Sequence, residues 1–519
     1  MRKEGILQLA QGLDWDTLAG KARAAAPEAF ASDGDPLNLI RGDWEAHGRP
    51  KAFHSPVDGS TLGSFPMLDP ETARSAVQAA AAEFDGWKRV DLDERRRRIS
   101  ACLSQMRAHR ELFAGLLVWE IGKPYDQALV SVDRCVAGVE WYVEQAESLL
   151  GSRKPLGLVS NIASWNYPMS VLMHAVLVQL LVGNVAIAKT PSDGGLFTLT
   201  LAMAMARREG LPVSLVSGSG RQLSEALVRG DAVDCLSFVG GKDTGRDIVA
   251  SLLDRNKRYM LEMEGVNAYG IWHFSDWKGL KAQLRKGFEY GKQRCTAYTR
   301  YVVEKRLFPK FLEMYLELVG ELRFGHPLLV GQPGDPPPTI AFGPLINDRS
   351  VEALNAKVSE ALSLGAVAIH ERSLDDGHFL PGQDTSAYFA PVALMNVPRP
   401  CKLYHAEPFG PVDTFVLVNG VEELVAEMNV SNGALVASIA CDDPTEAQEI
   451  AGELRAFKVG INRTRSRGDR EETFGGIGAS WKGCFVGGKY LVHALTQGEP
   501  GEPLYGNFPD RTLLPTDNR

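Results

Sequence analysis

The stretch MSVLMHAVLVQLLVGNVAIA, residues 169–188, is almost wholly apolar and decides how the middle of this chain folds. A membrane-spanning helix has a similar length, but His174, Gln179 and the pair Gly183-Asn184 interrupt the apolar run. Gly and Asn together are typical of a turn, and the short apolar segment after them is typical of a buried strand. The stretch therefore predicts a buried helix, a turn and a buried strand within a globular domain.

Similar short apolar segments flank this stretch and alternate with segments of helical spacing. Such alternation favours a parallel sheet with crossover helices, so we expect an α/β fold whose ligands bind beyond the carboxyl ends of strands. Three helices are expected before the sheet: one begins at Asp69-Pro70-Glu71, a second follows Asp91, and a third covers residues 125–150. The expected strands cover residues 156–163, 185–188, 213–216, 235–239 and 268–272.

The composition is that of an ordinary globular protein. The chain has 519 residues, 45% of them hydrophobic, which predicts two or three domains. Its net charge of -8 offers no basic surface for nucleic acid or for an anionic membrane. Seven widely spaced cysteines, with no CxxC pair, indicate neither a disulfide framework nor a zinc site, so no metal is expected. Free cysteines, and the lack of an apolar segment in residues 1–13, favour a cytoplasmic protein.

One cysteine stands out in the peptide Gly291-Lys-Gln-Arg-Cys295-Thr-Ala-Tyr-Thr-Arg300. A thiol attacks only as the thiolate, and a neighbouring cation such as Arg294, or a helix N-terminus, lowers its pKa toward working pH. Upstream lie an amide, Asn166, and a carboxylate, Glu262. Together such groups can oxidise an aldehyde. The thiol adds to it, the amide and a backbone N–H hold the oxyanion, a nicotinamide takes the hydride, and the carboxylate activates water to hydrolyse the thioester.

Seven motifs follow one another along the chain: Ser164-Trp-Asn166-Tyr-Pro168, Gly183-Asn-Val-Ala-Ile-Ala-Lys189, Phe238-Val-Gly240-Gly-Lys-Asp-Thr-Gly245, Leu261-Glu262-Met-Glu-Gly265, Gln293-Arg-Cys295, Glu407-Pro-Phe409-Gly-Pro411 and Phe474-Gly-Gly476. In order and spacing they resemble the aldehyde dehydrogenase superfamily, over about residues 50–497. The resemblance implies a Rossmann-type cofactor domain, an α/β catalytic domain and a short oligomerisation arm. Residues 1–262 are then the N-terminal and NAD(P)-binding domain and residues 263–465 the catalytic thiol domain. Residues 466–519 are the return segment to the cofactor domain and the C-terminal oligomerisation arm.

The resemblance also implies a role for each matching position. Cys295 resembles the nucleophile, Glu262 the general base and Asn166 the oxyanion donor. His174 matches a position in the aldehyde pocket, but it has a second interpretation as a histidine satisfied within the core. The positions that match the NAD or NADP site are Trp165, Lys189, Ser192, Gly240, Gly241, Met263, Glu407 and Phe409. Those that match the aldehyde pocket are Tyr167, His174, Arg294, Thr296 and Phe474.

Three departures from the family pattern bear on function. Ser192 stands where NAD-preferring members often carry a glutamate, so the side chain at this position does not repel a 2'-phosphate. Glu264 replaces a glycine beside the general base. It is either a hydrogen-bonded group that points away from the pocket or a carboxylate that crowds the nicotinamide and raises the pKa of its neighbours. Residues 150–155 are shorter than the family's segment, where a hairpin normally contributes to contacts within a homodimer or homotetramer.

The peptide Asn462-Arg463-Thr-Arg465-Ser-Arg467-Gly-Asp-Arg470 occupies the place where the family's C-terminal loop borders the aldehyde entrance. Its four arginines allow two interpretations. They attract an aldehyde that carries carboxylate or phosphate, or they belong to a solvated loop balanced by Asp469, Glu471 and Glu472.

The function predicted from the sequence is NAD(P)-dependent oxidation of an aldehyde to a carboxylic acid. Two alternatives stay open at this point. One is a CoA-acylating relative, in which a thiol in place of water resolves the thioester. The other is a family member that binds a ligand without catalysis because Glu264 alters its site.

Overall fold

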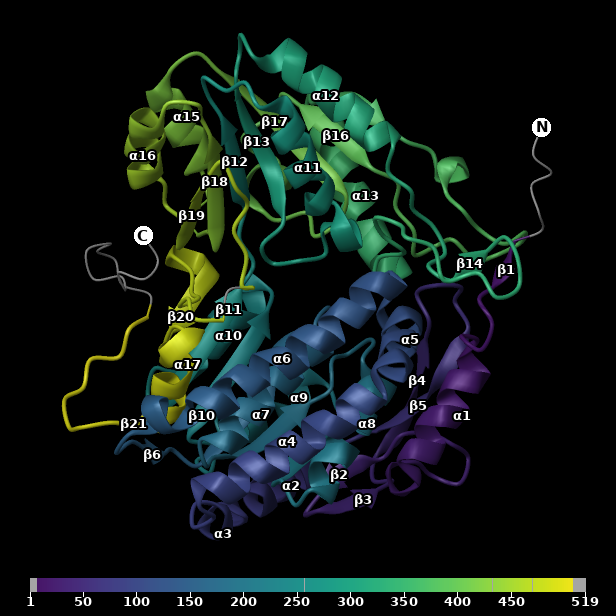
Figure 1. The fold of residues 1–519 in the computed structure, drawn as a ribbon, viewed down its shortest axis with the longest axis vertical. Coiled ribbons are helices and arrows are strands. Elements are labelled where there is room, and N and C mark those ends of the chain that lie inside the picture. Colours follow the sequence, from purple (N-terminus) through teal and green to yellow (C-terminus); the bar gives the residue numbers. More distant parts are fainter. Residues whose placement is uncertain (1–6, 256, 432, 469, 507–519) are drawn as a thin grey trace.

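The structure is a computed structural model that describes residues 7–255, 257–431, 433–468 and 470–506. Two bodies lie one above the other in Figure 1, each built of a sheet covered by helices. The lower body contains the N-terminal half of the chain and a segment from near its C-terminal end, whereas the upper body contains the region in between. Two distant parts of the sequence therefore share one sheet.

An eight-stranded sheet lies in the lower body, with the strand order β20-β11-β10-β7-β8-β9-β2-β3. The five strands from β11 to β9 pair in parallel, which confirms the expected parallel sheet. The flanking strands β20, β2 and β3 are antiparallel to their neighbours. The strands are β2 (Asn38–Ile40), β3 (Asp43–Glu45), β7 (Leu158–Ile162), β8 (Val185–Lys189), β9 (Val213–Val216), β10 (Cys235–Gly240), β11 (Arg258–Met263) and β20 (Trp481–Gly483).

The helices expected from the capping residues are present in this body. Asp69 caps α2 by accepting hydrogen bonds from the backbone N–H groups of Glu71 and Thr72 at 2.8 and 2.9 Å. Asp91 caps α4 in the same way, accepting from the N–H of Glu94 at 2.8 Å. The helices are α1 (Trp15–Ala25), α2 (Pro70–Ala82), α3 (Phe84–Trp87), α4 (Leu92–Ala108), α5 (Arg110–Ile121), α6 (Tyr125–Leu150), α7 (His174–Leu181), α8 (Leu196–Arg208), α9 (Gly220–Leu227), α10 (Lys242–Leu252) and α17 (Gly488–Leu495).

The apolar stretch 169–188 folds as predicted into helix, turn and strand. It begins with one π-helical segment, η2 (Pro168–Met173), continues as α7, turns at Gly183, where φ is 96°, and enters β8. All five residues of β8 are buried, which explains why its sequence is uniformly apolar up to Lys189. No helix in the described part of the chain is long and apolar enough to cross a membrane.

A seven-stranded sheet forms the upper body, with the strand order β15-β16-β17-β13-β12-β18-β19. All of its pairings are parallel except that of β15 with β16. The expected strand at 268–272 is β12, and it belongs to this second sheet rather than to the first. The elements are β12 (Asn267–Ile271), β13 (Tyr298–Glu304), β15 (Val367–Glu371), β16 (Val392–Met395), β17 (Val412–Val418), β18 (Val436–Ala440), β19 (Lys458–Ile461), α11 (Trp277–Gly287), α12 (Phe308–Gly320), α13 (Asp348–Ser363), α14 (Lys402–His405), α15 (Val421–Met428) and α16 (Pro444–Glu453).

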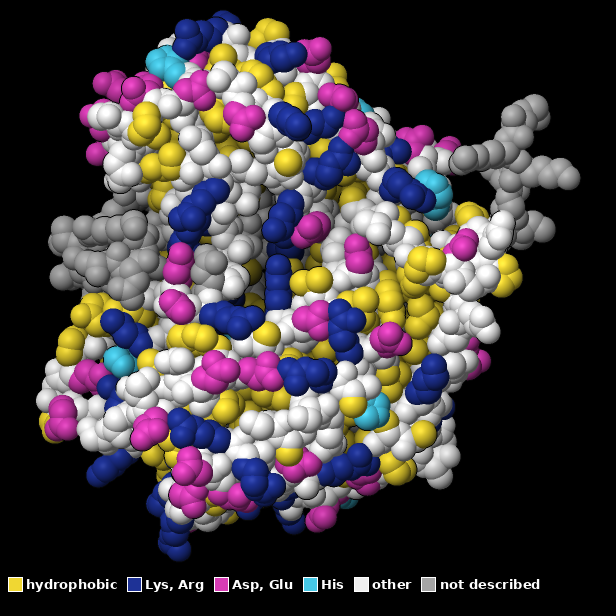
Figure 2. Space-filling model, in the orientation of Figure 1, with side chains coloured by type: hydrophobic (Ala, Val, Ile, Leu, Met, Phe, Trp, Pro, Cys, Tyr) yellow, Lys and Arg dark blue, Asp and Glu magenta, His cyan; other side chains and the backbone are white. Residues whose placement is uncertain are grey.

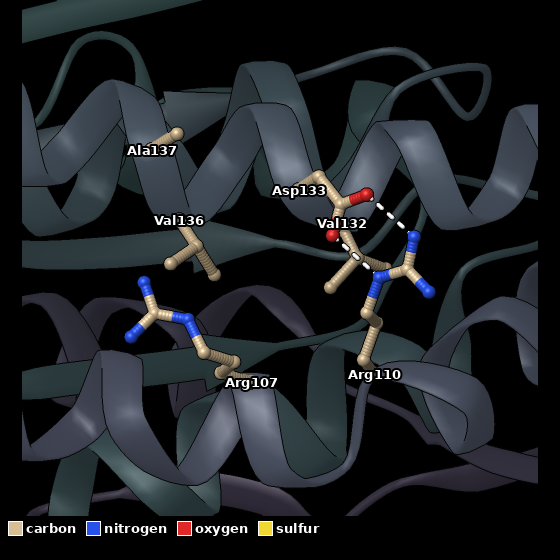
Figure 3. Close-up of a pocket in the computed structure, with 6 residues that line it drawn as sticks. All are labelled: Arg107, Arg110, Val132, Asp133, Val136 and Ala137. Atoms are coloured by element: carbon tan, nitrogen blue, oxygen red, sulfur yellow. Dashed lines mark hydrogen bonds and ion pairs between the residues drawn. The ribbon is translucent and has the colours of Figure 1, made fainter.

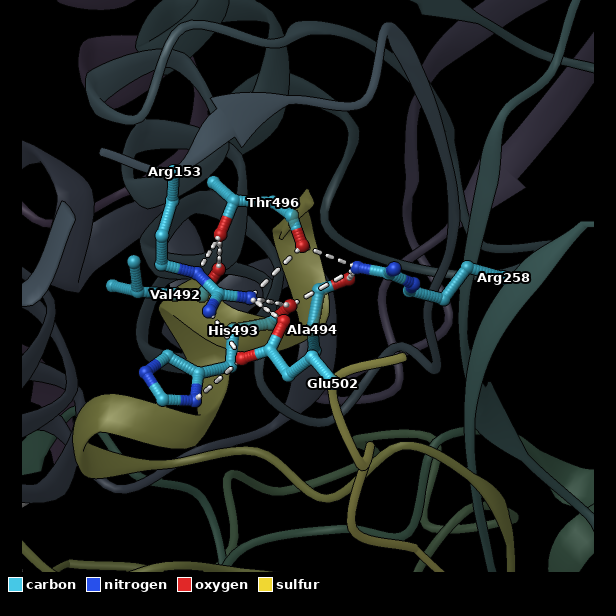
Figure 4. A network of polar contacts seen from close by, with 7 residues as sticks. All are labelled: Arg153, Arg258, Val492, His493, Ala494, Thr496 and Glu502. Carbon is cyan, nitrogen blue, oxygen red and sulfur yellow. Dashed lines mark hydrogen bonds and ion pairs between the residues drawn. The ribbon is translucent and has the colours of Figure 1, made fainter. Parts of the chain in front are cut away.

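Three two-stranded sheets complete the fold: β1 (Gln8–Leu9) with β14 (Leu329–Val330), β4 (Arg49–His54) with β5 (Thr61–Met67), and β6 (Lys154–Pro155) with β21 (Thr496–Gln497). The last of these closes the chain onto the lower body. Beside it, Arg153 donates to Thr496 Oγ1 at 2.7 Å and forms an ion pair with Glu502 (Figure 4). Arg258, at the start of β11, donates to the carbonyl oxygen of His493 at 3.0 Å. These hydrogen bonds thus hold the C-terminal segment against β11 and the strand β6.

The space-filling view shows acidic and basic side chains interspersed over this face, and a hollow between the two bodies with Lys and Arg side chains at its rim (Figure 2). The chain passes from one sheet to the other between the end of β11 at Met263 and the start of β12 at Asn267. The functional division into residues 1–262, 263–465 and 466–519 stays a prediction. Residues 1–6 and 507–519, at the two ends of that division, lie outside the described residues.

Candidate active site

Cys295 lies in a loop between the short helix η3 (Glu289–Lys292) and β13. Tyr290, Gly291 and Lys292 all have a φ of 59°, in the left-handed region that costs free energy for the two residues with a Cβ. Buried contacts hold this turn in place: Lys292 Nζ lies 2.6 Å from Asp413 Oδ1, and Asn267 Nδ2 donates to the carbonyl oxygen of Cys295 at 2.8 Å. The half-buried thiol is therefore presented by a rigid loop.

The surroundings of Cys295 raise the pKa of its thiol well above the ordinary value. Burial is the main cause, and the nearby Glu262 carboxylate adds to it. The cation that lowers the pKa of this thiol is Arg467. Arg294, which we expected to act on the thiol, donates from Nη2 to the carbonyl oxygens of residues 286 and 287, at 3.2 and 2.9 Å, at the end of α11.

Glu262 joins the nucleophile candidate to the arginine-rich loop. It lies near the carboxyl end of β11, where its side chain is 3% exposed. Its Oε2 is 2.8 Å from Nη1 of Arg467, in an ion pair whose arginine is 27% exposed. The carboxylate thus acts on the pKa of Cys295 and is paired with a more accessible guanidinium.

Asn166 lies in the turn after β7, and its side chain points at the loop of Cys295. Its Nδ2 donates to the carbonyl oxygen of Gln293 at 2.9 Å, while Ser164 Oγ donates to its Oδ1 at 2.5 Å. One amide proton is engaged in this way, which leaves the second proton of the same nitrogen available to an oxyanion. The structure therefore brings Asn166, Glu262 and Cys295 together from three distant parts of the sequence.

Sequence reasoning missed Lys123, which is 2% exposed behind Asn166. Its Nζ donates to the carbonyl oxygen of Asn166 at 2.9 Å and lies 3.9 and 4.4 Å from the ring centroids of Tyr167 and Tyr290. Burial lowers the pKa of Lys123 well below its ordinary value. The signal for Lys123 in the sequence was weak, since a lysine after a helix is usually solvated. What distinguishes it is its contact with the rings of Tyr167 and Tyr290, which come from distant parts of the chain.

Among the residues expected to bind the cofactor, Glu407 has the most unusual surroundings. Its side chain is 1% exposed, and both carboxylate oxygens are buried without a hydrogen-bond partner in the described residues. Burial, and next the charge of Glu264, raise the pKa of Glu407 well above its ordinary value, although Lys242, Lys357 and the nearby Gly265 N–H oppose them. Two orphaned acceptors in a buried position fit a ligand that supplies two hydroxyl donors, as the ribose of a dinucleotide does.

Glu264 itself directly follows β11, and its side chain reaches the N-terminus of α10. Its Oε1 accepts from the backbone N–H of Lys242 at 3.4 Å, and Ser480 Oγ donates to its backbone carbonyl oxygen at 2.9 Å. The second interpretation of Glu264, that its charge raises the pKa of a neighbour, agrees with the raised pKa of Glu407. The hydrogen bond to the first turn of α10 is present as well, so the two are not exclusive.

The remaining cofactor positions lie around the carboxyl edge of the eight-stranded sheet. Lys189 is 5% exposed and donates to the carbonyl oxygen of Thr190 at 2.7 Å; burial, and then the charge of Lys51, lower its pKa to about 8. Lys51, a residue that sequence reasoning missed, donates to the backbone oxygen of Ser192 at 2.9 Å. A Cβ added to Gly241, the N-cap of α10, meets no atom within 4 Å, so the space in front of that helix is open. Elsewhere, Gly240 ends β10, Met263 is buried at the end of β11, and Trp165 packs edge-on against Phe409.

The positions expected to line the aldehyde pocket differ in what they contact. Tyr167 packs against Lys123, and Thr296 is half-buried next to Cys295. Phe474 is buried beneath Arg467, whose guanidinium carbon is 5.4 Å from the ring centroid. The half-buried ring of His174 contacts the ring of Tyr142, and burial, with Arg467 and Arg470, lowers its pKa to about 3.

The four arginines of the loop differ in what they contact. Arg465 is buried and forms an ion pair with Glu472, so it is structural. Arg463 and Arg470 are exposed, and Arg467 alone among the four is paired with Glu262. The solvated interpretation of the loop thus holds for part of it and not for Arg467. Asp469, which that interpretation invoked, lies outside the described residues.

A separate surface pocket lies between α4, α5 and α6 (Figure 3). Arg110 and Asp133 form an ion pair across it at 2.5 Å. None of the predicted site residues lines it. The residues that do are Arg107, Arg110, Val132, Asp133, Val136 and Ala137.

The fold and the site together define an oxidoreductase with a thiol beside a dinucleotide-type sheet. The chain belongs to the aldehyde dehydrogenase family, because a sequence model of that family matches residues 44–499. This confirms the resemblance seen in the motifs. The protein is therefore an aldehyde dehydrogenase that uses NAD or NADP.

Individual relatives are similar over most of their length. The chain is 27% identical to an NADP-dependent glyceraldehyde-3-phosphate dehydrogenase of Streptococcus equinus, over 88% of this chain and 96% of that protein. It is 26% identical to a non-phosphorylating aspartate-semialdehyde dehydrogenase of Halomonas elongata, over 86% and 91%. Among solved structures, it is similar to an NADP-dependent glyceraldehyde-3-phosphate dehydrogenase from Bacillus halodurans C-125 complexed with NADP. The TM-score is 0.80, with 25% identity and coverage of 89% of this chain and 98% of that one.

Proposed function

We propose that this enzyme oxidises its aldehyde to a free carboxylic acid, with Cys295 as nucleophile, Glu262 as general base and Asn166 as oxyanion donor. The observation that supports it best is that Asn166 and Glu262 converge on the loop of Cys295: Asn166 Nδ2 donates to the carbonyl oxygen of Gln293 at 2.9 Å, and Glu262 lies near enough to the thiol to raise its pKa. A base within hydrogen-bond reach of a nucleophile, itself oriented by a third group, is the arrangement that activates a thiol. The roles of these three residues rest on this geometry.

The first chemical step is a proton transfer. The pKa of the Cys295 thiol is raised, so the thiol needs an acceptor for its proton when it attacks, and Glu262 is the carboxylate in contact with it. The sulfur then adds to the aldehyde carbon, and the carbonyl oxygen becomes an oxyanion. Asn166 Nδ2 and the backbone N–H of Cys295 stabilise that charge.

The nicotinamide, when bound, supplies the oxidation by accepting a hydride, which leaves a thioester on Cys295. Glu262 releases to solvent the proton that it took from the thiol and acts a second time, removing a proton from the water that attacks the thioester carbon. The carbon–sulfur bond breaks, the thiolate is reprotonated and the carboxylic acid leaves. Each turnover thus consumes one water and returns Cys295 to its thiol form.

Around the cofactor, we assign Glu407 to the hydroxyls of one ribose, because its two oxygens are buried and unpartnered. Lys189 and Ser192 belong to the other ribose, and the open space before Gly241 suits the pyrophosphate. Trp165, Met263 and Phe409 are assigned to the nicotinamide half.

Of the two alternatives, release to CoA is disfavoured by the buried carboxylate of Glu262 near Cys295, since a thiol acceptor needs no buried base at that position. We further propose a cytoplasmic homodimer or homotetramer, in which the β6–β21 ribbon is the oligomerisation arm. The seven free cysteines of the described chain support the cytoplasmic assignment.

The test follows reduction of NAD and NADP by absorbance, with purified protein and a panel of aldehydes. Cys295→Ala is expected to abolish reduction while cofactor binding remains. Glu262→Gln is expected to give a burst of reduced cofactor equal to the enzyme concentration, followed by a stall. Turnover retained in Cys295→Ala, or an unchanged steady rate in Glu262→Gln, contradicts the assigned roles. Appearance of acyl-CoA in place of free acid favours the first alternative, and failure to bind either cofactor favours the second.

A further inference from the structure

The ion pair between Arg467 and Glu262 has no part in the reaction described above. We propose that Arg467 binds the carboxylate of an aldehyde that carries one, and that this binding draws the guanidinium away from Glu262. The inference rests on the proposed function, because Glu262 is the base that is freed. It assigns a substrate class, the carboxylate-bearing aldehydes. It also gives a reason why the thioesters formed from such aldehydes are hydrolysed faster than those formed from neutral aldehydes.

The position of Arg467 suits it to bind a substrate. Its side chain is 27% exposed, whereas that of its partner Glu262 is 3% exposed, so the guanidinium lies on the accessible side of the base. Its guanidinium carbon lies 5.4 Å from the ring centroid of Phe474, which supports the guanidinium from one side. A guanidinium offers several N–H donors in one plane, and a carboxylate accepts two of them at once.

The charges around Arg467 favour an anion as well. Arg470 and Arg467 both act on His174, whose lowered pKa keeps the imidazole neutral near pH 7. The carboxylate of Glu472, by contrast, is already paired with Arg465 and Lys458. Glu262 is therefore the carboxylate that balances Arg467 in the described residues, and a substrate carboxylate can replace it without leaving the guanidinium unpaired.

The consequence for the base follows from its two contacts. Glu262 pairs with Arg467 through Oε2 at 2.8 Å and lies near enough to the Cys295 thiol to raise its pKa. A water that attacks the thioester must donate to a carboxylate oxygen of Glu262, and the guanidinium competes for that position. Exchange of one carboxylate for another on Arg467 opens it. A neutral aldehyde leaves the ion pair in place, so its thioester is hydrolysed slowly.

The experiment compares aldehydes of matched length, 5-oxopentanoate against pentanal, with glyceraldehyde 3-phosphate as a phosphate-bearing probe. The wild-type enzyme is expected to show a kcat/KM for 5-oxopentanoate roughly 10 to 100 times that for pentanal, the range of one charge-assisted pair. It is also expected to show a burst of reduced cofactor with pentanal and none with 5-oxopentanoate. Arg467→Gln is expected to remove the preference and to raise kcat for pentanal.

Two further variants separate binding from folding. Arg463→Gln changes an exposed arginine of the same loop and is expected to keep the preference. Arg467→Lys keeps the charge but not the planar donor pair, and it is expected to retain part of the preference. A preference that survives in Arg467→Gln, or a wild-type enzyme that prefers pentanal or the phosphate, overturns the assignment.

A direct binding measurement decides the case in which no aldehyde is turned over. Silence with every aldehyde contradicts the proposed function, but calorimetry with glutarate still tests Arg467. Glutarate is expected to bind the wild-type protein at least about tenfold more tightly than Arg467→Gln. Equal affinity of the two proteins for glutarate overturns the inference even when the enzyme is active.

Discussion

The buried pair of Lys292 and Asp413 holds the loop of Cys295, and its removal is expected to destabilise the upper body. Both side chains are at most 1% exposed, the charged atoms are 2.6 Å apart, and Tyr315 also donates to Asp413, at 2.8 Å. Burial lowers the pKa of Lys292 and raises that of Asp413, so each charge depends on the other to offset its desolvation.

Asp413→Asn keeps the shape of the side chain and removes its charge. Removal of one partner of a buried pair costs about 3–5 kcal/mol, and we expect about 3 kcal/mol because asparagine still accepts one hydrogen bond. For a unit of roughly 150–250 residues each kcal/mol lowers Tm by about 2–4 °C, so the variant is expected to melt about 6–12 °C lower. The assay is differential scanning calorimetry, with alkylation of Cys295 by iodoacetamide as a second readout of the loop.

The matched control is Asp133→Asn, which removes the charge from a surface pair with Arg110 whose side chains are 48% and 37% exposed. An exposed pair contributes at most about 1 kcal/mol, so Tm is expected to change little. The double variant Lys292→Met/Asp413→Leu is expected to regain most of the loss, since no charge then remains buried. A Tm for Asp413→Asn within about 2 °C of the wild type, or equal to that of Asp133→Asn, refutes the reasoning.

Three further predictions concern the cofactor and the thiol. Glu264→Gln removes a charge that raises the pKa of Glu407, so Glu407 ionises at lower pH and the cofactor binds more tightly near neutral pH. Fluorescence titration checks this, and weaker binding contradicts it. Lys51→Met is expected to raise KM for NADP roughly tenfold and to leave KM for NAD nearly unchanged, because its Nζ lies beside Ser192; steady-state kinetics with both cofactors decides. The raised pKa of Cys295 means that alkylation of its thiol is slow at neutral pH and keeps accelerating as the pH is raised beyond the ordinary pKa of a thiol; a rate that levels off before that point contradicts it.

Local signals in the sequence predicted the elements of the fold well. The cap at Asp69 and the helix at 125–150 depend on neighbouring residues, and the buried strands on short apolar runs, so each is visible in a short window. What no window shows is which sheet a strand joins. The strand at 268–272 looks like its predecessors, yet it begins the second sheet, because the choice depends on partners such as β13 and β18 that follow much later.

The site divides along the same line. The motifs placed Cys295, Glu262 and Asn166 near one another, and the structure has them in contact with one loop. The direction of a side chain is not visible in the sequence, however. Arg294 is adjacent to Cys295 along the chain but bonds to the preceding helix, whereas Arg467, distant in sequence, reaches Glu262. Lys123 was missed for the same reason, since its partners come from other elements.

The antiparallel pairing of β20 with β11 sets Trp481 opposite Glu262. A strand that follows much later in the chain thus covers the edge on which the base is carried. While the chain is still emerging, β11 has no neighbour on that side, and its unpaired N–H and C=O groups offer a template for another chain. A truncated chain that ends before β20 carries the nucleophile and the base, but it leaves the edge of β11 unpaired. Such an edge is a physical feature by which chaperones and proteases recognise an incomplete chain.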